Sequence, residues 1–311
     1  MDMKTQGTAN KHSILIGHLA CFAAYTFFGI NIVFCRDIAT SGQVSPMDVF
    51  CFRATGATLL FWLTSLFFPR EKVPFKDLVK IFFAAMIGMY VAQITFLHAM
   101  GHTTAFDASI IASTMPIMTM FIAAVVLKEP ITLKKAGGVA ISLAGVLLII
   151  FNSQHNGGAA RTEPVGVLLM LTNCLAFSLY LGIFRPLISR YHVITFMKWI
   201  FLFSMLMSVP FHLPSLLRLP YSEIETKVLW QIGYVVVFAT FITYFLIPIG
   251  QKRLRPTLVS MYTYVQPIIA AAISIAWGMD HFTWQKLLAA FLVFEGVHLV
   301  NKSRAAGQPQ R

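Results

Sequence analysis

Long apolar runs alternate with short polar breaks along the whole chain. A helix needs roughly 20 residues to cross a hydrocarbon layer about 30 Å thick, since each residue adds about 1.5 Å. Apolar runs of about that length, bounded by charged, Pro or Gly residues, predict transmembrane helices. We expect ten of them, at residues 13–35, 48–68, 78–100, 105–127, 133–151, 165–184, 195–213, 228–250, 256–277 and 284–301.

The composition supports an all-α membrane protein. Hydrophobic residues make up 57% of the 311 residues and charged residues 12%, which is too little charge to cover a soluble domain of this size. The net charge is +12, but the basic residues are scattered between apolar runs and do not cluster with aromatic residues. This distribution argues against nucleic acid and makes the lipid bilayer the expected partner. The four cysteines lie in or beside apolar runs without metal-ligand spacing, so we expect no metal or cofactor.

The basic residues also predict the orientation. An even number of helices places both termini on one side of the membrane, and that side carries 18 of the 24 Lys and Arg residues against 6 on the other. The positive-inside rule therefore predicts cytoplasmic termini, in an inner or plasma membrane.

The chain contains an internal duplication. A shift of 151 residues aligns residues 105–150 with 256–301 without a gap, and it superposes Ser109 on Ser260 and Pro116 on Pro267. A shift of 149 aligns the first expected helix with the sixth. Five helices per copy is an odd number, so the second copy must enter the membrane from the opposite side. The sequence predicts two inverted five-helix repeats, whose meeting point is a natural binding site.

The repeat sets the expected domain boundaries. We assign residues 1–151 to the first repeat and 165–301 to the second. The Gly-, Asn- and Gln-rich segment 152–164 is the expected linker, and 302–311 is the expected cytoplasmic tail.

Polar side chains recur on corresponding helices of the two halves, as a shared central cavity would require. Polar residues also join helices without any ligand, so packing is the alternative for each of them. The aromatic content of the set favours an amphipathic, neutral to zwitterionic solute. The expected cavity residues are Asn31, Tyr90, Gln93, Ser109, Ser113, Tyr180, Tyr244, Ser260 and Tyr264.

Prolines and ionisable residues within the helices add further candidates. Pro116 and Pro267 each remove a helix hydrogen bond at matching depths, so they are candidate hinges or static kinks. Glu295 and His98 are candidates for ion coupling, with a structural acid and a neutral hydrogen-bonded histidine as the alternatives. We expect Arg36, Arg53 and Arg185 to lie near helix ends and to extend toward the lipid headgroups. For Arg53 the alternative is a residue that braces the fold, and we do not expect it to contact the substrate.

Four motifs are distinctive: Phe96 to Ala105, Ala112 to Pro116, Leu127 to Pro130, and the closing Gly137-Gly138 and Gly145-Val146. They resemble the drug/metabolite transporter superfamily, and specifically its EamA-type ten-helix members. Pro46 with Arg53 is a further match. The resemblance implies a secondary transporter that moves a small organic metabolite, such as an amino acid or a similar amphipathic solute, by alternating access. Export is the expected direction, and a homodimer is a candidate assembly.

The sequence departs from the family pattern at two places. Gly278-Met279-Asp280 stands where the family shows a Glu, and the first helix lacks the coupling carboxylate of small multidrug relatives. Proton coupling therefore does not follow from the resemblance.

Two other functions compete with transport by a carrier. A channel would show a ring of like charges or a filter loop, and the sequence shows neither. A lipid-modifying enzyme is suggested by the spacing of His102 and Asp107 alone, across a short turn where Asp107 could instead cap a helix. No Walker A, H-E-x-x-H or G-x-S-x-G motif occurs, so we expect no enzyme.

Overall fold

The computed structural model describes residues 3–118, 122, 133–155, 162–254, 262–281 and 283–305, and no strand occurs within these ranges. Its elements are α1 (Met3–Ser41), α2 (Pro46–Ser65), α3 (Phe75–Ala85), η1 (Met86–Val91), α4 (Ala92–His102), α5 (Ala105–Ala112), α7 (Leu133–His155), α8 (Pro164–Ile183), α9 (Arg185–Arg190), α10 (Val193–Arg218), α11 (Thr226–Val236), η2 (Val237–Ile242), α12 (Thr243–Arg253), η3 (Tyr262–Tyr264), α14 (Val265–Ala276) and α15 (Trp284–Ala305).

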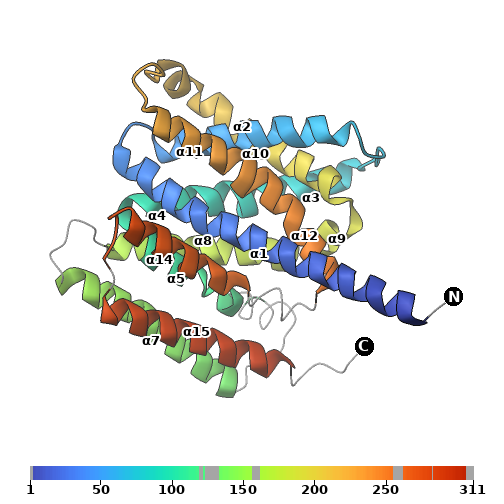
Figure 1. Ribbon diagram of the computed structural model, residues 1–311. Coiled ribbons are helices and arrows are strands. Elements are labelled where there is room, and N and C mark those ends of the chain that lie inside the picture. Colours follow the sequence, from blue (N-terminus) through green and yellow to red (C-terminus); the bar gives the residue numbers. More distant parts are fainter. Residues whose placement is uncertain are drawn as a thin grey trace.

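The expected all-α membrane fold is confirmed. In the described part of the chain, five helices are long and apolar enough to cross a bilayer, and three shorter apolar helices accompany them. Each of the ten expected segments corresponds to a described helix, although residues 119–121, 123–132 and 255–261 lie outside the description. The first helix is longer than predicted, because it continues in both directions beyond residues 13–35. Its first turn and the last turn of α15 lie at the same end of the bundle (Figure 1). We call the opposite end the far end.

The third and eighth helices show the duplication in their backbone. Each consists of an α-helix, a six-residue π-helix and a second α-helix. The bounds of α3, η1 and α4 become those of α11, η2 and α12 when 151 is added to every number. π-helical turns are rare, so their presence at corresponding residues reflects a shared feature of the two halves.

The fourth and ninth helices are also interrupted at corresponding places. Helix α5 ends at Ala112, and a turn at Ser113 and Thr114 precedes the helical residues 115–118. In the second half, the 3₁₀ turn η3 ends at Tyr264, which the 151 shift pairs with Ser113. Pro116 and Pro267 follow these breaks, which agrees with the hydrogen bond that proline removes from a helix.

Helix packing follows a pseudo-two-fold pattern. The most extensive contact joins α7 to α15, the closing helices of the two halves, and the next joins their second helices, α2 and α10. Helix α4 packs on α8, and helix α12 packs on α1. These two contacts are equivalent, because the repeat relates α4 to α12 and α8 to α1. Figure 1 shows α7 and α15 side by side along one flank, with α5 and α14 between them and the rest of the bundle. The two halves are therefore interleaved throughout.

The α7–α15 contact lies on the pseudo-two-fold axis. Ser142 donates a hydrogen bond to the carbonyl oxygen of Val293 at 3.1 Å, and the 151 shift makes these two residues equivalent. Gly138 meets the backbone of Gly296, and Gly145 meets that of Ala289, so the two contacts are also repeat-related. A side chain at either glycine would push the helices apart, which explains the small residues at this crossing.

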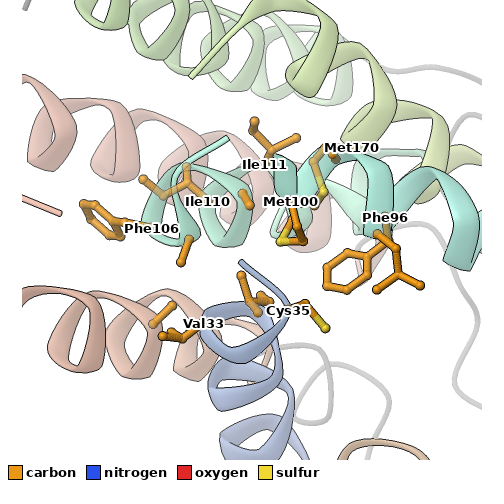
Figure 2. Packing of buried hydrophobic residues seen from close by; sticks show 14 of the residues in the cluster. Val33, Cys35, Phe96, Met100, Phe106, Ile110, Ile111 and Met170 are labelled. Carbon is orange, nitrogen blue, oxygen red and sulfur yellow. The ribbon is translucent and has the colours of Figure 1, made fainter. Parts of the chain in front are cut away.

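The larger apolar cluster of the described residues lies where α1, α4, α5 and α8 meet (Figure 2). Val33 and Cys35 come from α1, and the ends of α4 and α5 face them across the core. Elsewhere, large apolar side chains such as Leu168 and Phe291 are more than half exposed, as expected for helices whose outer faces are in contact with lipid. This packing leaves the polar and charged interior residues as the candidates for function.

Candidate functional site

Gln93 and Tyr244 meet where the two halves of the molecule join. Gln93 is the second residue of α4 and Tyr244 the second residue of α12, and both follow a π-helical segment directly. The Tyr244 hydroxyl is within hydrogen-bonding reach of Gln93 and donates to the Met89 sulfur at 3.6 Å. The sequence predicts this pair from the repeat alone, and the structure brings its members together.

Arg53 lies beside this pair, deep in the protein. Its side chain is 3% exposed, and its Nη1 has no hydrogen-bond partner. The ionisable side chains that interact with its charge are Tyr244 of the second half and Cys35 of α1. The expectation that Arg53 extends toward the headgroups is therefore wrong. Helix α2 begins at Pro46, so Arg53 lies two turns inside it, on the face that packs inward.

Asn31 completes a set that we call the central cluster: Asn31, Cys35, Arg53, Gln93 and Tyr244. Asn31 is 4% exposed, and its Oδ1 accepts a hydrogen bond from the Cys35 thiol at 3.6 Å. The cluster draws on α1, α2 and α4 of the first half and on α12 of the second. In the described residues, no group of His, Cys, Asp or Glu side chains could hold a metal ion.

Aromatic rings pack against Tyr244 of the central cluster. The Tyr244 ring makes edge contacts with Phe28 at 6.4 Å and with Phe201 at 5.7 Å between centroids. Tyr90 makes a similar contact with Phe50 at 5.6 Å, one turn before Arg53 on α2. The cluster thus combines one cation and several neutral hydrogen-bonding groups with an aromatic surround.

Tyr180 serves mainly as a packing residue beside the cluster. It is 2% exposed, and a side chain at Gly88 would overlap its ring. Its hydroxyl is close enough to interact electrostatically with Tyr244. The sequence predicts a cavity residue here, and the structure places it in the wall of the cluster.

The expected serines lie elsewhere. The hydroxyl of Ser109 donates to the carbonyl of Phe106 at 2.6 Å, and that of Ser113 donates to the carbonyl of Ser109 at 3.0 Å. Tyr264 donates to the carbonyl of Phe294 at 3.4 Å and packs on its ring. Ser260 lies outside the described residues. The two described serines therefore bond to carbonyls of their own helix. Tyr264 alone of the described members of this set joins two helices, α14 and α15, through this bond.

The two coupling candidates lie on the outside of the bundle. Glu295 on α15 and His98 on α4 are both exposed, and the His98 Nδ1 is 2.9 Å from the carbonyl oxygen of Ile94. Of the remaining arginines, Arg36 donates to the carbonyl of Met100 at 2.6 Å and so caps the end of α4. The side chain of Arg185 lies outside the description.

A second buried set of charges lies at the far end, and we call it the end cluster: Thr162, Asp107, Asp280 and Lys286. The Lys286 Nζ lies 2.6 Å from Asp280 and 3.7 Å from Asp107. Thr162 donates to the other oxygen of Asp107 at 2.6 Å. The end cluster thus ties α5 of the first half to the start of α15 in the second.

These contacts remove the main support for an enzyme. His102 bonds to Glu163 at 2.7 Å, and Asp107 bonds within the end cluster. The helix cap at α5 is the Thr104 hydroxyl, which accepts from the Asp107 backbone N–H. His102 and Asp107 therefore do not form a catalytic pair.

Comparison with known proteins decides the family. The family model described as "EamA-like transporter family" matches residues 15–151 and again residues 164–302. The chain belongs to this family. As an EamA-like transporter it is an integral membrane protein, a transporter and not an enzyme, and its two matches reflect duplicated halves.

The relatives of this EamA-like transporter are distant. It is 24% identical to the uncharacterized transporter YcxC of Bacillus subtilis, over 97% of this chain and 99% of that protein. It is 26% identical to the thiamine-repressible mitochondrial transport protein THI74 of Saccharomyces cerevisiae, over 73% of this chain and 63% of that protein. It is 22% identical to the WAT1-related protein At3g53210 of Arabidopsis thaliana, over 91% and 84%.

A solved structure titled "Crystal structure of protein" has the same fold. It superposes with a TM-score of 0.62 at 15% identity and covers 96% of this chain and 99% of that one.

The sequence did contain a signal for the position of Arg53. Phe50, Ala54, Ala57 and Phe61 are all buried, and their spacing places Arg53 on the same helical face. The Asp107–Lys286 contact left no such signal, because it joins residues far apart in the chain.

Proposed function

We propose that this EamA-like transporter moves a small organic solute by alternating access, as a secondary transporter with the central cluster as its binding site. The observation that carries the proposal is the Gln93–Tyr244 contact between the inverted halves, beside a buried Arg53. Secondary transporters with inverted repeats bind substrate near the midplane, at the repeat interface. Rocking of one half against the other would then expose this interface to each side in turn.

The substrate class follows from the surroundings of the cluster. Aromatic rings and neutral hydrogen-bonding groups suit an amphipathic molecule such as an amino acid or a similar metabolite. The names of the relatives refer to different functions, so we choose the substrate class from the chemistry of the site.

We also propose the orientation, the direction and the assembly. The 18 to 6 division of Lys and Arg favours cytoplasmic termini in an inner or plasma membrane. Export is the direction that we propose from the family resemblance. A homodimer through α15 would cover the exposed Glu295, since a carboxylate facing lipid is costly. A cysteine at the exposed Phe291, in a background without the four native cysteines, should cross-link two copies under oxidation. Absence of a cross-linked dimer would count against this assembly.

Counterflow in proteoliposomes tests transport. Vesicles are loaded with an unlabelled mixture of amino acids and organic acids, and the isotope-labelled mixture is added outside. A carrier should accumulate at least one labelled compound transiently above equilibrium, without ATP. Simple equilibration of the label would support a channel instead.

Variants connect this flux to the central cluster. Gln93→Ala and Tyr244→Phe should lower the counterflow at least several-fold while expression stays normal. The matched controls are Gln285→Ala and Tyr221→Phe, both at exposed positions. Normal counterflow in both cluster variants would overturn the site.

A further inference from the structure

The buried, unpartnered Nη1 of Arg53 points to a missing anion in the central cluster. Arginine keeps its charge in proteins, and a buried charge is costly unless it is paired. Arg53 is 3% exposed, and its Nη1 is fully buried without a hydrogen-bond partner. No residue of the described chain supplies the counter-charge.

The other buried charged side chains of the described chain all have partners. Asp48 bonds to Ser45 and lies 3.0 Å from the His212 imidazole. Asp77 bonds to Arg190 and Tyr191. Lys286 bonds to Asp280 and has Asp107 as a second counter-charge at 3.7 Å. In those places a charge joins two elements of the fold. Arg53 forms no such link, so its charge has no structural use in the described contacts.

We propose that Arg53 binds the carboxylate of an organic monocarboxylate substrate. This inference rests on the proposed function and names the substrate class of the same site. The planar guanidinium offers two parallel N–H groups, which match the two oxygens of a carboxylate. Tyr244, which interacts with the charge of Arg53, and Gln93, which lies within hydrogen-bonding reach of Tyr244, supply further hydrogen-bond donors for the same group.

The rest of the cluster narrows the ligand class. Arg53 is the one cation among the five cluster residues, so it balances a single negative charge, and a phosphate dianion would remain uncompensated. The cluster contains no carboxylate, so the ammonium group of a substrate would meet neutral acceptors only. The rings of Phe28, Phe201 and Tyr90 suit an apolar or aromatic body.

Matched acids and amides test this assignment by thermal unfolding of the purified full-length chain. The probes are 3-phenylpropionate, 4-methylpentanoate and hexanoate, each with its neutral amide, together with inorganic phosphate and chloride. At least one acid should bind about 10- to 100-fold more tightly than its amide, as expected when a hydrogen-bonded charge pair is lost. Arg53→Met should abolish that preference, and Arg53→Lys should weaken it. The control Arg218→Met removes an exposed arginine and should leave it unchanged.

A second measurement uses the unaltered protein, in case the variants fold poorly. Phenylglyoxal modifies arginine, and the rate at Arg53 is followed by mass spectrometry of its peptide. The acid that binds should slow this rate several-fold, and its amide should not.

Three results would overturn the inference. The first is that every acid binds as tightly as its amide. The second is that the preference for the acid remains in Arg53→Met. The third is that phosphate or chloride binds more tightly than every acid and that this binding depends on Arg53. Counterflow of neutral solutes alone would leave the proposed transport function intact while it removes the carboxylate assignment.

Discussion

Two buried basic side chains of this transporter lie in opposite surroundings. Lys286 is 7% exposed and contacts two carboxylates, at 2.6 and 3.7 Å. Arg53 is 3% exposed, and none of the ion pairs in the described residues includes it. The two residues are buried to nearly the same extent. Lys286 has carboxylate partners, whereas Arg53 has none in the described residues.

This difference separates a structural charge from a functional one. A buried pair contributes little net stability compared with apolar packing, but the loss of one partner leaves the other charge uncompensated. Lys286 therefore secures the contact between the two halves at the far end. Arg53 already lacks a partner, so the folded protein bears its cost, and a ligand that supplies an anion recovers that free energy.

We expect the largest effect from Lys286→Met, which removes the cation of the end cluster. Asp107 and Asp280 would remain buried without a cation, at a cost of about 3–5 kcal/mol in the free energy of unfolding. Tryptophan fluorescence during thermal or denaturant unfolding measures the loss.

The matched control for this variant is Lys80→Met. Lys80 is 61% exposed and 3.5 Å from Asp77, so its removal should cost less than about 1 kcal/mol. Equal stability of the two variants would show that the end cluster has no structural role.

Asp280→Asn should have a smaller effect. Lys286 would keep Asp107 as its counter-charge, so charge stays balanced while the 2.6 Å contact weakens. We expect a loss of about 1–3 kcal/mol, as for a hydrogen bond that involves a charged group. The same unfolding assay applies, with the exposed Glu223→Gln as control. A loss equal to that of Lys286→Met would contradict this account.

Arg53→Met removes the buried cation that has no counter-charge in the described residues. Because the charge has no partner to lose, the ligand-free protein should unfold at the same free energy or up to about 1 kcal/mol higher. The measurement is again thermal unfolding, and Arg218→Met is the reference. A loss of more than about 2 kcal/mol would mean that Arg53 braces the fold, and the contrast with Lys286 would disappear.

Glu295→Gln should have the smallest effect. Glu295 is exposed on α15 and belongs to neither cluster, so the variant should lie within about 0.5 kcal/mol of the parent. Flux driven by a pH gradient, measured in the same vesicles, should also stay intact. Loss of that flux in a stable protein would instead make Glu295 a relay.

The fold could largely be predicted from the sequence, because its main signals are local or periodic. The length of the apolar runs predicts ten helices, and the 151 shift alone pairs Gln93 with Tyr244. The π-helical segments were not predicted, since a π-turn and an α-turn in apolar sequence differ by no residue pattern. The interruption at Ser113 was signalled only by the nearby Pro116.

The candidate site could be predicted only in part. Polar residues such as Ser109 satisfy their own helix, and a sequence does not reveal which carbonyl a hydroxyl will reach. The prediction for Arg53 is wrong because it relies on the short distance from Arg53 to the start of an expected helix. The helical face that Arg53 shares with the buried Phe50 and Ala57 is the better guide. The end cluster depends on a contact between the two halves, which only the folded chain defines.

The matched π-helical segments restrict how the length of this protein can vary. A π-turn holds about one residue more than the α-turn it replaces, and each α-helical residue turns the chain by about 100°. Deletion of one residue from Met86–Val91 would restore a regular α-helix and rotate Gln93 away from Tyr244. Deletion from Val237–Ile242 would rotate Tyr244 in the same manner. Loops between helices can gain or lose residues freely, whereas these two segments must keep their length for the halves to face one another.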